Sequence, residues 1–190
     1  ALHAEPNNRK AAEGIINIYF CPSRRKPERL PGIESSLPSK SLRGALDYAG
    51  NGGNDYKYNT QKGSIAGFVI FRRPSGSLKD TEVVDGLSNT LAVGERAFNR
   101  NASSTYYDEN NGYFDGYDWD TVRWGAFTPE RDRKEKVPPG PKYSYKFGSS
   151  HPATCQFVYG DGSVKGIPYN VDKNVFKLLS TRSDGKVIKE

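Results

Sequence analysis

Two residues near the C-terminus, His151 and Asp161, are of the types that most often perform acid–base chemistry. An imidazole oriented by a carboxylate can act as a base, and three serine hydroxyls that could serve as nucleophiles lie close by in sequence. No second histidine lies near them, and no Gly-x-Ser-x-Gly motif occurs. We therefore favour a structural role at the ends of a hairpin, with a metal or ligand site as the second interpretation and catalysis as the third. The serines are Ser149, Ser150 and Ser163.

A second group of candidate ligands consists of aspartates in the segment 113–124. Carboxylate oxygens are the ligands that Ca²⁺ prefers, and the ion takes about six to eight oxygens. The spacing does not fit the EF-hand loop, and Asp-Gly also serves ordinary turns. Calcium is therefore a cofactor that the pattern permits but does not require. The candidates are Asp115, Asp118 and Asp120, with Asp161 as a further one.

The two cysteines, Cys21 and Cys155, lie far apart in sequence. Such a pair forms a disulfide in an exported protein or remains as two reduced thiols in the core, and the residues alone leave both alternatives open. We do not expect the cysteines to bind a metal. A structural zinc site needs about four ligands, and His3 and His151 are the only histidines.

The segment 113–124 is denser in aromatic residues than any other stretch. Its rings could stack on sugars or on a protein partner, or they could fill the core of a chain that is poor in aliphatic residues. If the segment is a strand, Tyr117, Trp119 and Thr121 share one face. We expect core filling for at least one tryptophan, and we expect Arg123 to pair with a nearby aspartate or to stack on Trp124. The candidate ligand-binding residues are Tyr113, Tyr117, Trp119, Arg123 and Trp124.

The composition indicates one domain with a small apolar core over residues 1–190. Apolar residues make up 35% of the chain, whereas a typical globular domain has roughly 45–50%. Twelve tyrosines, nine phenylalanines and two tryptophans offset this deficit, because each large aromatic ring buries much surface. Twenty glycines and 12 prolines are spread along the chain and predict many turns, which excludes a helical bundle.

The net charge of +6 permits attraction to nucleic acids and to anionic surfaces. The basic residues are scattered, however, and no nucleic-acid-binding motif accompanies them, so we expect no nucleic-acid partner. No stretch approaches the roughly 20 apolar residues that a membrane-spanning helix needs.

Local patterns predict mostly strands and loops, with a short helix near each end. The strongest hairpin signal is the pair of runs at 156–159 and 164–167, which Gly-Asp-Gly-Ser separates. A C-terminal amphipathic helix follows Asn170 or Asp172 and ends near Thr181. The other expected elements are an N-terminal arm or helix at 1–14 and strands at 15–20, 67–71 and 91–96, of which the last two are antiparallel neighbours. We also expect a tight loop at 47–55. Surface segments are expected at 22–41, 99–112 and 128–142, and the last of these is charged and proline-rich.

Four sequence motifs occur together in one order along the chain. They are Tyr-Phe-Cys-Pro-Ser-Arg-Arg at 19–25, Asp-Tyr-Ala-Gly-Asn-Gly-Gly at 47–53, Asp-Gly-Leu-Ser-Asn-Thr at 85–90 with Gly-Glu-Arg at 94–96, and Phe-Gly-Ser-Ser-His at 147–151 followed by Asp-Gly-Ser-Val at 161–164. In this combination, over residues 15–188, the chain resembles the prepilin-type processing-associated family of planctomycete-type bacteria, domain of unknown function 1559. That family is defined by a histidine, nine residues and Asp-Gly, and nine residues separate His151 from Asp161 here.

We expect an α+β domain with a mostly antiparallel sheet, long ordered loops and a C-terminal amphipathic helix, and the resemblance implies that it is a type II secretion pseudopilin-like domain. It also implies an exported protein of the cell envelope, cell surface or extracellular space. In the family, a prepilin peptidase processes a leader that precedes one hydrophobic helix. Neither segment is in this sequence, and we expect membrane contact only through that helix.

The resemblance also bears on individual residues. It implies a disulfide between Cys21 and Cys155, and it favours calcium, which extracellular pseudopilins often use to hold a C-terminal loop. We expect structural roles for the motif residues, which are His151, Asp161, Gly162, Asp85, Gly86, Asn89, Asp47, Gly50 and Gly52.

We therefore expect a non-enzymatic structural subunit that assembles with copies of itself or with other envelope proteins. The alternative is an extracellular module that binds glycans or other solutes through the aromatic segment 113–124. Buried tryptophans favour assembly, whereas a concave and exposed aromatic strip favours binding.

Overall fold

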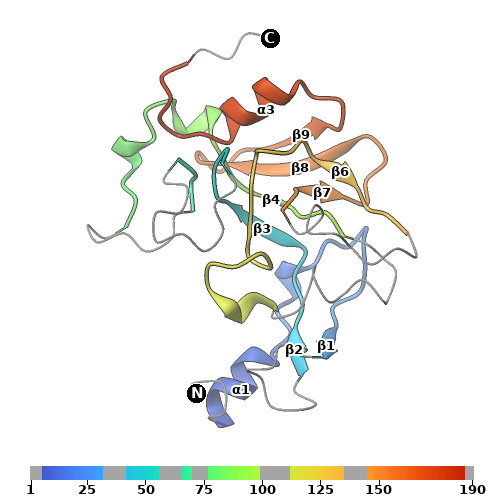
Figure 1. Ribbon diagram of the computed structural model, residues 1–190. Helices are drawn as coiled ribbons and strands as arrows, with labels where there is room; N and C mark the ends of the chain where they lie inside the picture. The colour runs from blue at the N-terminus through green and yellow to red at the C-terminus, as the bar shows by residue number, and fades with distance from the viewer. Residues whose placement is uncertain are drawn as a thin grey trace.

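The computed structural model describes residues 6–31, 42–55, 66–69, 77–98, 112–134 and 145–186. Within these ranges the chain has an α+β fold, as the sequence predicts. A central sheet carries the C-terminal helix α3 (Lys173–Leu179) on one face (Figure 1). The N-terminal helix α1 (Pro6–Ala12) lies at the other end of the molecule, near the predicted N-terminal helix position.

The central sheet has five strands in the order β5-β3-β4-β8-β9. Neighbouring strands are antiparallel, except that β3 and β5 are parallel. The mostly antiparallel sheet is therefore confirmed. The strands are β3 (Tyr48–Asn51), β4 (Leu91–Glu95), β5 (Val122–Arg123), β8 (Thr154–Tyr159) and β9 (Val164–Pro168).

Strands β8 and β9 form the hairpin that the sequence predicts. In its turn, the Asp161 carboxylate accepts hydrogen bonds from the Ser163 hydroxyl (2.7 Å) and the Ser163 amide (2.9 Å), and these bonds lower the pKa of Asp161. Gly162 has a φ of 84°, a left-handed conformation that glycine adopts without strain. The Asp-Gly pair therefore shapes the turn of this hairpin.

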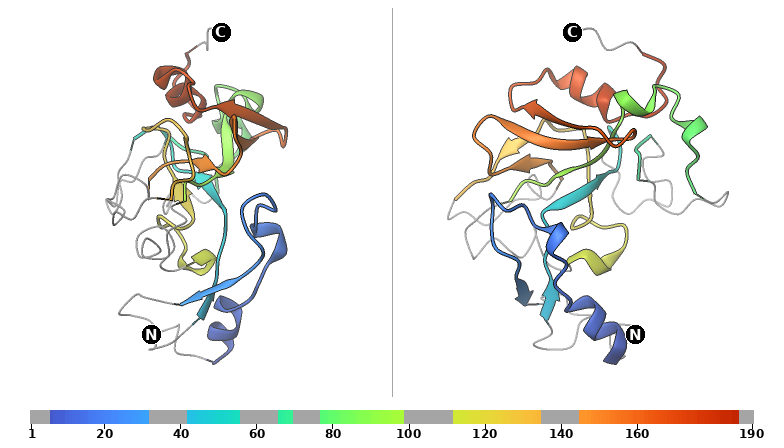
Figure 2. Two further views of the ribbon diagram at one scale, coloured as in Figure 1. Left: turned by 90° about the vertical axis from the view of Figure 1, so that its right-hand side faces the viewer. Right: turned by 180° about the vertical axis from the view of Figure 1, so that it is seen from behind.

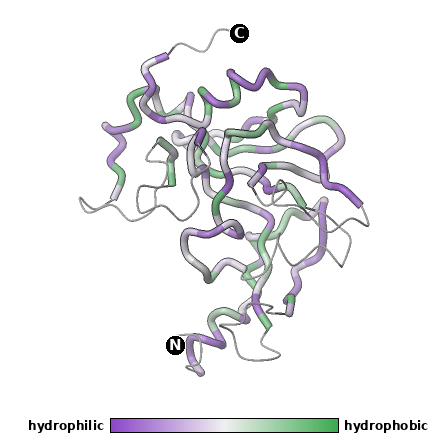
Figure 3. Tube along the Cα trace, viewed as in Figure 1, coloured by the Kyte–Doolittle hydropathy of each residue, from purple (hydrophilic) through white to green (hydrophobic). Residues whose placement is uncertain are grey.

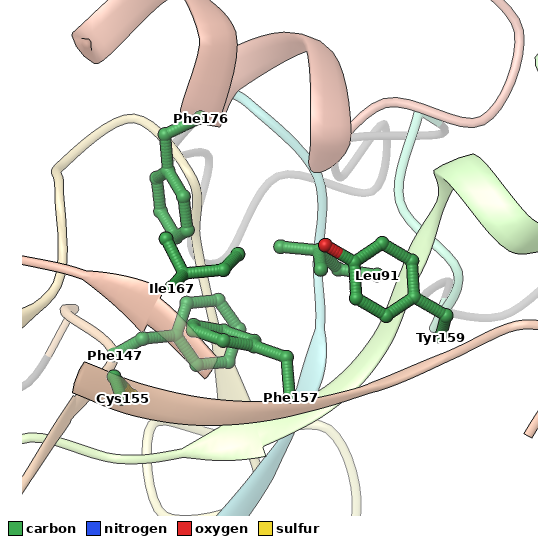
Figure 4. Close-up of a cluster of buried hydrophobic side chains, with 7 residues drawn as sticks. All are labelled: Leu91, Phe147, Cys155, Phe157, Tyr159, Ile167 and Phe176. Carbon is green, nitrogen blue, oxygen red and sulfur yellow. The ribbon is translucent and has the colours of Figure 1, made fainter. Parts of the chain in front are cut away.

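Helix α3 begins where the sequence predicts because Asp172 caps it, accepting hydrogen bonds from the amides of Asn174 (2.8 Å) and Val175 (3.1 Å). Phe176 points from the helix toward the sheet, as Figure 4 shows. Its ring packs edge-to-face on Phe157, with ring centroids 5.7 Å apart. The core cluster consists of Leu91, Phe147, Cys155, Phe157, Tyr159, Ile167 and Phe176.

A β-bulge in β4 decides which of its side chains face α3. Leu91 pairs with Tyr159 whereas Val93 pairs with Val158, so β4 has one extra residue between the two pairs. Directly paired residues share a face of the sheet, and Tyr159 belongs to the core under α3. Leu91 therefore faces α3, while Val93, and Glu95 two residues later, point to the opposite face.

Two small sheets flank the central one, as the views from the side and from behind show (Figure 2). Strands β1 (Arg29–Pro31) and β2 (Leu42–Gly44) are antiparallel and lie toward α1, whereas β6 (Glu130–Arg131) and β7 (Gly148–Ser149) are parallel. Within the described ranges, four 3₁₀ helices lie in the connecting segments: Asn17–Tyr19, Asp80–Glu82, Leu87–Asn89 and Gly112–Asp115.

One predicted strand is not formed, and another is not a strand in the part that the structure describes. Residues 15–20 contain the 3₁₀ helix Asn17–Tyr19 instead, and Ile18 is 80% exposed, so the apolar run is not a buried strand. The structure describes residues 67–69 of the predicted strand 67–71, and these residues form a bend beside β3. The Val69 amide donates to the Asn51 carbonyl of β3 (2.8 Å). The predicted strand 91–96 is confirmed as β4, but its neighbours are β3 and β8.

Some predicted loops contain regular structure. The segment 47–55 includes β3, the segment 22–41 includes β1, and the segment 128–142 includes β6. The segment 113–124 does not alternate as a strand: it begins in a 3₁₀ helix followed by bends, and only Val122–Arg123 pairs in the sheet. Residues 99–111, most of the predicted insertion, lie outside the described residues, as do 32–41 and 135–144.

Apolar residues occur in short stretches along the strands and on α3 rather than in one long run (Figure 3). Within the described ranges, no helix combines the length and the hydropathy that crossing a membrane requires.

The core predicts a large effect for Phe176→Ala. Phe176 is 0% exposed, and removing a buried phenylalanine side chain costs about 3–5 kcal/mol in the free energy of unfolding. The measurement is urea unfolding followed by circular dichroism. Val84→Ala is the control, because Val84 is 69% exposed, and a loss of similar size in both variants contradicts the assignment of Phe176 to the core.

Candidate functional site

The side chain of Arg24 is 1% exposed and joins several segments that are distant in sequence. It forms two hydrogen bonds with the Asp132 carboxylate, from Nε to Oδ2 (2.9 Å) and from Nη2 to Oδ1 (3.1 Å). It also donates to the main-chain carbonyls of Asp47 (3.2 Å), Arg96 (2.7 Å) and Gly148 (3.1 Å). These carbonyls lie just before β3, just after β4 and in β7. One guanidinium therefore fixes the ends of three strands.

Asp47 is the second centre of this network and is fully buried. Its Oδ1 lies 2.7 Å from Arg25 Nη2 and 3.4 Å from Arg24 Nη1. Its Oδ2 accepts a hydrogen bond from the Cys21 amide (2.9 Å). The carboxylate therefore holds the turn that begins at Cys21 against the start of β3.

The network is electrically balanced, since two arginines, Arg24 and Arg25, meet two aspartates, Asp47 and Asp132. Burial by itself lowers the pKa of Arg24, but the carboxylates of Asp132 and Asp47 outweigh it and raise the pKa above the usual range. The guanidinium therefore stays charged, and loss of either partner leaves an uncompensated buried charge.

A second buried ion pair joins the aromatic segment to β4. Arg96 Nη1 lies 3.3 Å from Asp120 Oδ1, and Arg96 Nε donates to the Leu46 carbonyl (2.9 Å). Asp120 Oδ2 accepts from the Gly112 amide (2.6 Å). This pair orients the segment that leads into β5.

Next to the arginine network, Cys21, Glu95 and His151 form a compact cluster. His151 Nε2 lies 3.8 Å from Cys21 Sγ and 3.3 Å from Glu95 Oε1. All three candidate ligand atoms lie within 4.8 Å of one another. Cys21 and Glu95 are buried, whereas the His151 side chain is 29% exposed. In the part of the chain that the structure describes, this is the one group of three His, Cys, Asp or Glu side chains close enough to share a metal ion.

Main-chain contacts hold each member of this cluster. The Cys21 amide is bonded to Asp47, as described above. Glu95 Oε2 accepts from the Gln156 amide (2.8 Å). The His151 amide donates to Ser149 Oγ (3.2 Å), and the Tyr169 hydroxyl donates to the His151 carbonyl (2.8 Å). The cluster is therefore positioned by the fold.

The geometry does not fit a cysteine–histidine–carboxylate relay. In such a relay the carboxylate holds one ring nitrogen and the nucleophile faces the other. Here Cys21 Sγ and Glu95 Oε1 both face Nε2 of His151. In addition, burial and the neighbouring Glu95 carboxylate raise the pKa of Cys21, which makes the thiol a poorer nucleophile at neutral pH. The shared nitrogen argues against a nucleophilic relay, and the proximity of the three atoms makes the cluster a candidate metal site.

The second thiol, Cys155, faces a different group. Its Sγ lies 3.6 Å from the Glu95 carbonyl oxygen, and burial raises its pKa well above the usual value. Both cysteines are free and buried. The disulfide that the family resemblance implies is therefore not formed, because Cys21 faces His151 while Cys155 faces the main chain of β4.

The structure separates His151 from Asp161. They lie beyond opposite ends of β8 (Thr154–Tyr159), and Asp161 bonds within its own turn while His151 lies against Glu95. The two residues therefore do not form a catalytic dyad.

Among the side chains that the structure describes, the aspartates expected as calcium ligands do not converge on one site. Asp161 lies in the β8–β9 turn, and Asp120 is engaged by Arg96 and the Gly112 amide. Asp118 is buried just before β5, and the side chain of Asp115 lies outside what the structure describes.

The aromatic segment 113–124 contributes to the interior. Trp124 and Arg123 are both 0% exposed, so neither can stack on a sugar. Tyr113, Tyr117 and Trp119 are half-buried. The ring contacts are edge-to-face and join Tyr117 to Trp124 (6.4 Å between centroids), Trp119 to Tyr145 (5.1 Å), Trp124 to Tyr145 (6.2 Å) and Tyr113 to Tyr19 (5.4 Å).

The motif at 85–90 anchors the C-terminal segment. The Asp85 carboxylate accepts from the amides of Asp184 (2.9 Å) and Gly185 (2.8 Å). Asn89 Nδ2 donates to the Asp85 carbonyl (3.1 Å), and Gly86 precedes the 3₁₀ helix Leu87–Asn89.

The glycines of the motif at 47–53 allow close packing around β3. The Gly50 amide donates to the Thr121 carbonyl (2.8 Å), which begins the parallel pairing with β5. A Cβ at Gly52 would lie 2.7 Å from Trp124 Nε1, so only glycine fits against the buried indole.

Glu95, Arg96, Arg24 and Asp132 were not among the predicted site residues. A signal for two of them was present, because Glu95 and Arg96 directly continue the apolar strand 91–93, and charged residues in a buried strand need partners. Asp132 carries no such signal, since it stands in a charged segment with many similar residues.

The fold and the site together define an α+β domain organised around a buried arginine–carboxylate network. A family model described as a protein of unknown function, DUF1559 (SBP_bac_10), matches residues 1–174. The chain belongs to this family, which confirms the family resemblance at that level. Comparison with curated proteins and with solved structures gives no match.

The network predicts that Arg24→Ala strongly destabilises the fold. Removing one partner of a buried ion pair costs about 3–5 kcal/mol in the free energy of unfolding. The control is Arg9→Ala, which removes the exposed 2.8 Å pair with Glu13 and should cost at most about 1 kcal/mol. Urea unfolding of both variants measures the difference, and equal losses refute the central position of Arg24.

The cysteine geometry predicts two free thiols per chain. Protein that is unfolded in the presence of iodoacetamide, without prior reduction, should gain two carbamidomethyl groups by intact mass, because both cysteines are free, with Cys21 Sγ against His151 and Cys155 Sγ against the Glu95 carbonyl. A mass lower by two hydrogen atoms and no alkylation would show a disulfide instead.

Proposed function

We propose that this chain is a non-enzymatic structural subunit that acts through protein–protein assembly, with a second copy of the chain as its partner. The observation that carries the proposal is an open apolar groove on the sheet face opposite α3. On the family resemblance alone, we assign this subunit to the cell envelope or surface as a pseudopilin-like protein.

The groove has a volume of about 560 Å³ and is almost entirely apolar. Its floor includes Val93 and Val158, which pair across β4 and β8 on the face away from α3. Its rim includes Ile18 and Val164, which are 80% and 64% exposed. The complete lining is Ile18, Tyr19, Tyr48, Val93, Gly94, Gln156, Phe157, Val158 and Val164.

Exposed aliphatic residues grouped over one groove favour a protein partner, because burying them removes apolar surface from water. Helix α3 covers the apolar core on the other face, so the groove is a separate apolar surface. The burial of Trp124 and Arg123 argues against the alternative of a glycan-binding strip at 113–124, since the stacking faces are inside the protein.

The proposal predicts that charges on the rim abolish self-association. In Ile18→Asp and Val164→Asp, a carboxylate would have to be desolvated at the contact, which opposes binding. Sedimentation velocity over a range of concentrations should show association of the wild-type chain and monomers of both variants.

Val84→Asp is the matched control, because Val84 is 69% exposed but lies outside the groove. It should associate like the wild type. A wild-type chain that stays monomeric throughout, or rim variants that associate like the control, would overturn the proposal.

A further inference from the structure

We propose that Cys21, Glu95 and His151 bind one Zn²⁺ ion through Sγ, a carboxylate oxygen and Nε2, with a water molecule as the fourth ligand. This site is independent of the assembly groove. The inference rests on the geometry of the cluster, on one unsatisfied buried oxygen and on the charge of the ligand set.

The distances fit tetrahedral zinc. With bonds of about 2.3 Å to sulfur, 2.0 Å to nitrogen and 2.1 Å to oxygen, tetrahedral ligands lie about 3.4–3.6 Å apart. The observed separations from His151 Nε2 are 3.8 Å to Cys21 Sγ and 3.3 Å to Glu95 Oε1. These two separations are within a few tenths of an ångström of the tetrahedral values, and the third, between Cys21 Sγ and a Glu95 oxygen, is at most 4.8 Å.

The independent observation is Glu95 Oε1. This atom is buried on a side chain that is 1% exposed, and within the described residues it accepts no well-oriented hydrogen bond, although His151 Nε2 lies 3.3 Å from it. Its companion Oε2 is satisfied by the Gln156 amide (2.8 Å), which aims Oε1 at His151. A buried carboxylate oxygen without a donor is costly, and a bound cation removes that cost.

The ligand set also balances the charge of the ion. A thiolate and a carboxylate supply two negative charges, and a neutral imidazole adds none, so the complex with Zn²⁺ is neutral in its buried surroundings. Sulfur and imidazole ligands disfavour Mg²⁺ and Ca²⁺, which prefer oxygen. The partly exposed His151 leaves access for the ion and for the water ligand.

The ligands are held in place by the fold. The Asp47 carboxylate fixes the Cys21 main chain, the β-bulge turns Glu95 to this face, and Tyr169 and Ser149 hold the main chain of His151. Contacts of this kind reduce the rearrangement that binding requires and orient the ligands.

The test uses the reduced, metal-free 190-residue chain. Calorimetric titration with Zn²⁺ should give one ion per chain, and Co²⁺ should produce a thiolate-to-cobalt charge-transfer absorption. His151→Ala should lower the affinity for Zn²⁺ by at least about 100-fold, since even changes to groups that only orient ligands cost 10–100-fold. Cys21→Ala should also abolish the Co²⁺ charge-transfer band.

The chain offers matched controls in its other cysteine and its other histidine. Cys155→Ala and His3→Ala should keep the wild-type affinity and the cobalt spectrum, because Cys155 faces the Glu95 carbonyl and His3 is not one of the three proposed ligands. His151→Ala changes a partly exposed side chain, and its circular dichroism spectrum checks that the fold is retained. Binding of no Zn²⁺ by the wild type, unchanged affinity in His151→Ala, or loss of binding in either control overturns the proposal.

Discussion

The buried guanidinium of Arg24 is the interaction on which the arrangement of this domain depends. It bonds the Asp132 carboxylate and three carbonyls, which belong to segments before β3, after β4 and in β7. A lysine could not replace it, because one ammonium lacks the planar set of donors that reaches all these acceptors. Strand ends in a small sheet fray readily, and here a single charged side chain holds them together.

This design gives the two faces of the sheet different chemistry. Under α3, aromatic and aliphatic side chains form the core around Phe176. The opposite face carries an apolar groove, and the register of β4 turns Glu95, with the cluster of Cys21, Glu95 and His151, to that face. A chain with 35% apolar residues has limited material for a core, so paired charges occupy interior volume that aliphatic residues fill in other domains. Pairing is obligatory there, because an isolated buried charge is too costly.

Elements that are shaped by residues adjacent in sequence could be predicted, whereas elements that depend on what covers them in the fold could not. The β8–β9 hairpin and the capped helix α3 follow from residues adjacent in sequence, namely Asp161, Gly162 and Asp172. The segment 15–20 was predicted as a strand because it is apolar, but Ile18 lies on the rim of a groove instead of in the core. A hydrophobic pattern shows which residues are apolar, but it does not show whether other parts of the same chain cover those residues.

The sequence by itself determined the α+β class, the hairpin, the C-terminal helix and the membership of the family, because these depend on local patterns and on motif order. Only the tertiary structure decided that Cys21 meets Glu95 and His151 rather than Cys155, and that His151 is far from the turn of Asp161. The physical reason is the register of β4. One extra residue between Leu91 and Val93 turns Glu95 to the other face, and no local sequence signal fixes where a bulge falls.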